Sequence, residues 1–149
     1  MQGKHKGSTF EFEEQRNRNL LKVYRMVMAT ADCTTMQTEI FRKVVMHESE
    51  RFWVSEERAD AVICKIRREG FHVLKNMYPL KRKMYREIYE RTMNMMDDNP
   101  GMSRLDALSR VLSEPAPEFY LTPSSASVIL CKAKKKWYQE RKQKLRHLF

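Results

Sequence analysis

The sequence contains little glycine, few cysteines and no long apolar run, and each shortage excludes a class of protein. Four glycines and three cysteines occur among 149 residues. Because the cysteines are odd in number and far apart, we expect reduced thiols rather than a disulfide framework. No apolar stretch approaches the ~20 residues that span a bilayer, and no apolar run follows the basic N-terminus. These features predict a cytoplasmic protein with no secretory signal and no membrane contact.

Motifs for catalysis and metal binding are also missing. The sequence has no glycine-rich phosphate loop and no Gly-x-Ser-x-Gly segment. Its four histidines are scattered and have no cysteine at metal-ligand spacing. Carboxylate pairs such as Asp97 and Asp98 lie in polar segments, where turns are more common than catalytic clefts. We therefore predict that the protein is not an enzyme and that it has no cofactor and no metal site.

Positive charge is abundant, and most of the excess lies at the C-terminus. The formal net charge is +10, from 29 Lys and Arg against 19 Asp and Glu. Residues 132–149 contribute +7 of this charge, because they contain eight basic residues and one acid. The remainder of the chain is nearly balanced. A cationic cluster attracts phosphate backbones or other acidic surfaces, although a solvated helix face carries the same pattern.

The chain contains an internal repeat at a constant shift of 67 positions. Residues 36–69 align without a gap on residues 103–136. Five aligned pairs are identical: Val44 and Val111, Phe52 and Phe119, Ala59 and Ala126, Cys64 and Cys131, and Lys65 and Lys132. Around these identities several other pairs agree in chemistry, such as Glu39 with Asp106 and Lys43 with Arg110, and the match continues upstream when two residues are inserted in the second copy. Such self-similarity indicates two copies of one structural unit.

Each copy is predicted to form three helices. Apolar residues recur at helical spacing over residues 20–28 and again from residue 84 onward. The second helices are short, around residues 40–45 and 107–112. Ser55 and Thr122 stand at the N-cap positions of the third helices, and Pro123 occupies the favoured first helical position. Gly70 can cap the third helix of the first copy, whereas that of the second copy continues into the basic C-terminus.

Connectors of about eight to ten residues separate the second and third helices. Two prolines forbid a continuous helix through the second connector. Both connectors end in an aromatic pair, Phe52-Trp53 and Phe119-Tyr120. We expect Phe52 and Phe119 to fill the core, because large rings between two helices of a small bundle usually do so. Their neighbours cannot easily point inward as well.

The predicted fold is therefore all-α, with two tandem three-helix modules of helix-turn-helix type and a long basic C-terminal helix. The expected boundaries are a flexible tail over residues 1–13, a first module over 14–70, a linker over 71–80, and a second module with its helical extension over 81–149. This layout resembles the general trihelical helix-turn-helix class. The usual tight turn with glycine is replaced by a longer loop, which leaves the angle between the last two helices open. The repeated Phe-aromatic-aliphatic-hydroxyl segment and the Lys-rich ending are also similar to uncharacterised small basic proteins of gut anaerobes, a similarity that implies no activity.

The helix-turn-helix resemblance implies that the third helices contact nucleic acid, since the last helix of that motif lies in the DNA major groove. Hydroxyl groups can bond base edges or phosphates, and cations neutralise phosphates. In the first copy the predicted contacts are Arg58, Lys65 and Arg68. In the second copy they are Ser124, Ser125, Ser127, Lys132, Lys134, Lys135, Lys136, Arg141 and Lys142. The second copy is the stronger candidate, because Glu56 and Glu57 open the third helix of the first copy and repel phosphate.

DNA is the first expectation for the partner, and two other interpretations stay open. Aromatic residues are interleaved with lysines over residues 134–138, where they could stack on unpaired bases of RNA or single-stranded DNA. Alternatively, Trp137 simply covers the edge of the core. Leu145, Leu148 and Phe149 add an apolar stripe that suits a protein partner or a homodimer. In that interpretation the chain is an adaptor whose basic C-terminal helix docks on an acidic partner.

Overall fold

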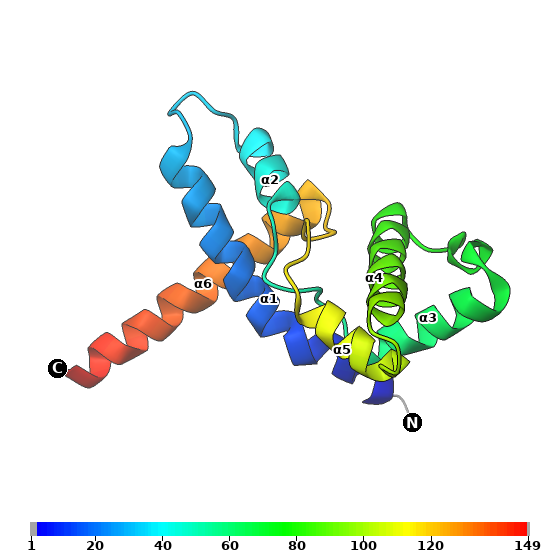
Figure 1. Ribbon diagram of the computed structural model, residues 1–149. Coiled ribbons are helices and arrows are strands. Elements are labelled where there is room, and N and C mark those ends of the chain that lie inside the picture. Colours follow the sequence, from blue (N-terminus) through cyan, green and yellow to red (C-terminus); the bar gives the residue numbers. More distant parts are fainter. Residues whose placement is uncertain (1–2, 149) are drawn as a thin grey trace.

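The computed structural model describes residues 3–148, and it describes the side chains of residues 12–147. Within this part of the chain the fold is all-α, which confirms the predicted fold class (Figure 1). The elements in chain order are α1 (Gly3–Thr30), α2 (Gln37–Met46), α3 (Glu56–Glu69), the 3-10 helix η1 (Phe71–Leu74), α4 (Pro79–Asp98), α5 (Arg104–Ser113) and α6 (Pro123–Leu148).

Local sequence explains where the third helices begin and end. Ser55 Oγ accepts a hydrogen bond at 3.2 Å from a backbone N–H in the first turn of α3. Thr122 Oγ1 accepts the equivalent bond at 3.1 Å from the first turn of α6, and Pro123 opens that helix. Gly70 ends α3 with a φ of 97°, a left-handed conformation that costs glycine least. The predicted caps at these positions are therefore confirmed.

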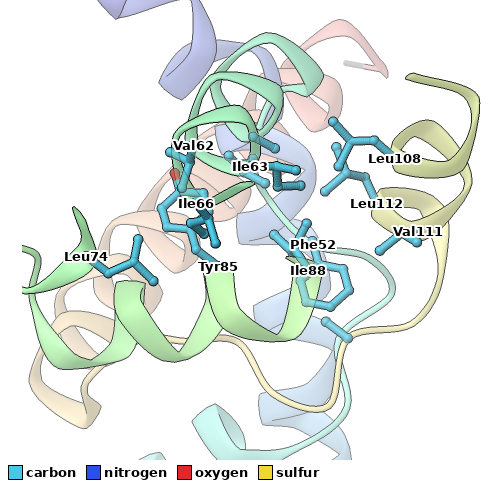
Figure 2. Packing of buried hydrophobic residues seen from close by; sticks show 13 residues of the cluster. Phe52, Val62, Ile63, Ile66, Leu74, Tyr85, Ile88, Leu108, Val111 and Leu112 are labelled. Carbon is cyan, nitrogen blue, oxygen red and sulfur yellow. The ribbon is translucent and has the colours of Figure 1, made fainter. Parts of the chain in front are cut away.

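Two separate clusters of buried side chains form the interior. The first joins α1, α2 and α6 and contains Leu20, Leu21, Val23, Tyr24, Ile40, Val44, Val45, Phe119, Ala126 and Leu130. The second joins α3, α4 and α5 (Figure 2) and contains Phe52, Val54, Ala59, Val62, Ile63, Ile66, Leu74, Tyr85, Ile88, Leu108, Val111, Leu112 and Ala116. Phe52 and Phe119 are 1% and 5% exposed, so each fills a core as expected.

Each third helix packs on the first two helices of the other sequence copy. Helix α6 lies against α1 and α2, whereas α3 lies against α4 and α5. This arrangement differs from the expected tandem modules over 14–70 and 81–149, in which each third helix would pack on its own copy. It also means that the consecutive helices α2 and α3 do not form the expected helix-turn-helix pair, because the main helical contact of α2 besides α1 is α6.

Two extended connectors, residues 47–54 and 114–121, cross one another and produce this exchange. Ser49 and Ala116 form an isolated antiparallel bridge at the crossing, and each donates a backbone hydrogen bond to the other at 2.9 Å. An extended chain spans up to ~3.3 Å per residue, so a connector of this length reaches the neighbouring unit instead of turning back. Each connector therefore delivers the helix that follows it to the opposite unit (Figure 1).

Two segments that were expected to be irregular contain helix. Helix α1 begins at Gly3, so it runs through most of the expected tail over residues 1–13. The Phe12 ring lies 6.3 Å from the Trp53 ring and 4.1 Å from the Arg51 guanidinium. The expected linker over residues 71–80 contains η1 and the start of α4, and its Leu74 is 2% exposed within the second cluster. Residues 1–13 have no apolar stripe that would indicate a helix, whereas Phe71, Leu74 and Tyr78 in the expected linker are spaced as on one helix face and could have indicated its contacts.

Candidate nucleic-acid interface

Helix α6 turns one face to the core and leaves another exposed. Ala126 and Leu130 are buried on its inner face. The opposite face is exposed and follows the periodicity of a helix, because each of its positions lies three or four residues from another position of the set. It comprises Ser124, Val128, Cys131, Lys132 and Lys135. We call this set the α6 outward face. The prediction from sequence omitted Val128, which is 55% exposed, although its spacing from Ser124 places it on this face.

Most predicted contacts on α6 are exposed. The exposed ones are Ser124, Ser125, Lys132, Lys135, Lys136, Arg141 and Lys142, and Ser127 is half-buried. Lys136 Nζ lies 3.7 Å from a carboxylate oxygen of Glu14, but an ion pair this exposed contributes little. Among the residues whose side chains are described, no ion pair involves Lys132, Lys135, Arg141 or Lys142. The charges of Lys132, Lys135 and Lys142 are therefore available to a partner, and that of Arg141 is exposed although its guanidinium also lies 5.1 Å from the centre of the Trp137 ring.

Two predicted contacts on α6 are engaged within the fold instead. Lys134 is half-buried, and its Nζ lies 4.1 Å from the centre of the Tyr24 ring, where the ring face attracts a cation. The Ser125 hydroxyl accepts a hydrogen bond from the Thr122 hydroxyl at 2.9 Å, so it belongs to the N-terminal cap of α6. The sequence indicated an outward placement for both side chains, and we leave them out of the interface.

The predicted contacts on α3 are exposed but less available. The Arg58 side chain hydrogen-bonds the Tyr85 hydroxyl. Burial raises the pKa of Tyr85, and the charge and hydrogen bond of Arg58 oppose that rise. Arg68 lies 3.3 Å from a carboxylate oxygen of Glu69, whereas Lys65 has no ion pair among the described side chains. Two exposed glutamates also open this helix. Helix α3 is therefore a weaker phosphate-binding element than α6.

Beyond its packing unit, α6 continues as a projecting helix (Figure 1). Every residue from Tyr138 to His147 is exposed. This projecting segment carries the cations Arg141, Lys142, Lys144 and Arg146. The last two were not among the predicted contacts, although the charge excess of the C-terminus includes them. A solvated helix with four cations and one acid presents positive charge to any partner that approaches it.

Trp137 does not present a free ring for base stacking. The ring is half-buried, and the guanidinium groups of Arg25 and Arg141 each lie 5.1 Å from its centre. The Tyr138 ring meets it edge to face, with 5.1 Å between the centroids. These contacts favour the interpretation that Trp137 covers the edge of the core over the one in which it stacks on unpaired bases.

A groove with a volume of about 430 Å³ lies between α1 and α6. Its lining comprises Glu13, Glu14, Asn17, Arg18, Leu21, Lys132, Ala133, Lys136, Trp137 and Glu140. Three carboxylates among these residues balance its three cations, so the groove offers phosphate no net positive charge. We therefore assign the interface to the α6 outward face and the projecting segment rather than to this groove.

Other kinds of site find no support in the part of the chain that is described. No group of three His, Cys, Asp or Glu side chains there could hold a metal ion. Cys33, Cys64 and Cys131 are free thiols, as expected. None of the described helices combines the length and apolarity needed to cross a membrane. No protein-family model, curated protein or solved structure matches the chain. The function is therefore inferred from the residues of this chain alone.

Proposed function

We propose that this protein binds nucleic acid, and DNA in the first place, through the outward face and the projecting segment of α6. It acts as a regulatory or accessory protein and catalyses no reaction itself. The observation that carries this proposal is the row of exposed cations without ion pairs along one helix. Lysine and arginine side chains that neutralise phosphates release counterions, and this release supplies much of the affinity for nucleic acid.

The geometry of α6 supports this use of its charges. Helix α6 is anchored by its inner face at Leu130 and by the ring of Trp137, and it then projects from the body. A helix held at one end fixes the spacing of the backbone positions that carry its cations, so only their side chains have to be ordered on binding. The hydroxyl of Ser124 and the methyl groups of Val128 lie nearer its N-terminus, where they could contact base edges.

The test compares two variants that remove the same charge from different places. The first is K132Q/K135Q/R141Q/K142Q, on α6. The matched control is K43Q/K75Q/K81Q/R110Q, whose four cations are exposed on other elements and make no described ion pair. We expect the α6 variant to lose at least about tenfold in affinity for a fluorescent 25-base-pair duplex near ~0.1 M salt, and the control to lose less than about threefold.

Circular dichroism of both variants checks that the helices persist. Equal losses in the two variants would show that net charge, rather than α6, governs binding, and this result would contradict the assignment of the interface. Binding of single-stranded DNA or RNA in preference to the duplex would redirect the proposal to those partners. No binding of any of the three at low salt would overturn it.

A second candidate is an adaptor whose projecting segment docks on an acidic protein. The observation in its favour is that Tyr138 and Leu145, seven residues apart on one helix face, are 60% and 48% exposed. An apolar stripe between cations suits a protein groove. The variant Y138S/L145S separates the two functions, because it should leave duplex affinity nearly unchanged and abolish capture of an acidic partner.

A further inference from the structure

We infer that the chain is a single-chain counterpart of an intertwined dimer, and that α3 and α6 address two unlike, inverted half-sites on one DNA duplex. This inference rests on the proposed function and specifies its partner. The proposed partner is double-stranded DNA, and each of the two units contacts it through its third helix.

The first support is a local twofold relation at the crossing of the connectors. The bridged residues Ser49 and Ala116 are 67 positions apart, which is the shift of the sequence repeat. Two further backbone hydrogen bonds are related to each other by the same shift. Phe52 N donates to Leu112 O at 3.2 Å, and Phe119 N donates to Val45 O at 3.0 Å. When residue i contacts residue j and the equivalent of j contacts the equivalent of i, the two halves are related by a twofold axis.

The helices follow the same relation. The bounds of α2 and α5 differ by 67 at both ends, and α3 and α6 begin 67 residues apart. Helix α3 packs on α4 and α5 as α6 packs on α1 and α2. A twofold axis relates equivalent faces by a half-turn and keeps them at equal height along the axis, so faces that tilt toward one end of the axis both do so. The two third helices start near the crossing and run outward in opposite directions (Figure 1).

Duplex DNA is the partner whose symmetry and shape match this pair of helices. Its backbone has its own twofold relation between half-sites, which is why symmetric dimers bind palindromic sites. The major groove of B-form DNA admits a helix, whereas the deep and narrow groove of an RNA duplex does not. The positive charge of α6 supplies the complementarity to the phosphate backbone.

The half-sites are unlike because the equivalent faces differ in chemistry. The α6 outward face has Ser124, Val128 and Lys135 where the α3 face has Glu57, Ala61 and Arg68. All six residues are exposed. A glutamate can accept a hydrogen bond from the amino group of cytosine, whereas apolar groups contact the methyl group of thymine. We therefore expect cytosine to be preferred under α3 and thymine under α6.

The experiment selects bound sequences from a pool of random duplexes with the full chain and then with the variant E57S/A61V/R68K. These three substitutions give α3 the outward residues of α6, since the other two positions of each face are already cysteine and lysine. The full chain should enrich two unlike half-sites in inverted orientation. The variant should enrich two similar half-sites, so that the site becomes palindromic. The control R86K/E90S makes the same change in charge on exposed positions of α4 and should leave the selected site unchanged.

The outcomes separate this inference from the proposed function. Enrichment of a single half-site that does not change in the variant would show that α3 makes no base contact. Salt-dependent binding without any enriched sequence would overturn the paired half-sites as well. In both cases nucleic-acid binding by α6 would stand. Absence of all duplex binding would overturn both proposals.

Discussion

The hydroxyl of Ser49 lies where the two connectors cross and joins three groups around it. It accepts a hydrogen bond from Trp53 Nε1 at 2.7 Å, and it lies 2.9 Å from the carbonyl oxygen of Arg51 and 3.3 Å from Asn19 Oδ1. Ser49 is 1% exposed, so its hydroxyl is shielded from water, whereas its partner Trp53 is half-buried. Its repeat equivalent is Ala116, which shows that the backbone of this position accommodates an alanine.

We therefore predict that Ser49→Ala lowers the free energy of unfolding by about 1–3 kcal/mol, because it leaves the half-buried indole N–H of Trp53 without its acceptor. This loss of stability should come from the missing hydroxyl group and not from the smaller side chain, since alanine fits the equivalent position 116. Urea unfolding followed by tryptophan fluorescence measures it. Ser113→Ala, at an exposed position at the end of α5, is the control and should change stability little. Equal stability of the two variants would contradict this account of the crossing.

Residue placement on α6 could be predicted only in part from the sequence. The inward spacing of Ala126 and Leu130 was clear from periodicity. Lys134 follows Leu130 by four residues and therefore lies on the inner side, so the same periodicity could have placed it over Tyr24. Its charge suggested the outward face instead. The cation–aromatic contact explains how a lysine occupies that position.

At the scale of elements, most of the helix boundaries could be predicted from local signals. Ser55, Thr122 and Ser103 cap their helices, and Gly70 ends α3. The exchange of the third helices could not be predicted in this way. Both copies carry the same apolar pattern, so α3 and α6 suit either pair of partner helices. The choice depends on the path of the connectors, which is a tertiary property.

The exchange of the third helices predicts which helices each core substitution loosens, and tandem modules would predict the opposite pair. Leu130→Ala removes a side chain that is 1% exposed in the cluster of α1, α2 and α6. It should cost about 2–5 kcal/mol and accelerate amide hydrogen exchange in α1 and α2 more than in α4 and α5. The matched variant Ile63→Ala, at the equivalent position of α3, should accelerate exchange in α4 and α5.

Hydrogen exchange read by mass spectrometry at peptide level separates the two arrangements. If Leu130→Ala loosens α4 and α5 while Ile63→Ala loosens α1 and α2, each third helix packs on its own copy and the exchange is wrong. Uniform loosening of the whole chain is avoided by working in a mild concentration of stabilising osmolyte, where global unfolding is suppressed.

At the scale of the whole molecule, the charge is distributed unequally over two similar units. The unit of α1, α2 and α6 carries the projecting cations, whereas the third helix of the other unit begins with two exposed glutamates. A negatively charged partner would therefore be held mainly by the unit of α1, α2 and α6. The sequence indicated this inequality through its C-terminal excess of +7, but it did not indicate which unit the basic helix joins.

The most direct test of nucleic-acid binding by α6 is the salt dependence of duplex binding by the full chain, measured by fluorescence anisotropy. Each phosphate contact contributes about −0.9 to the slope of the logarithm of the association constant against the logarithm of salt concentration. With the exposed cations of α6 in contact, we predict a slope of about −3 or steeper, and a slope nearer zero for K132Q/K135Q/R141Q/K142Q. Undetectable binding at low salt, or a slope that these substitutions leave unchanged, would contradict the proposed function.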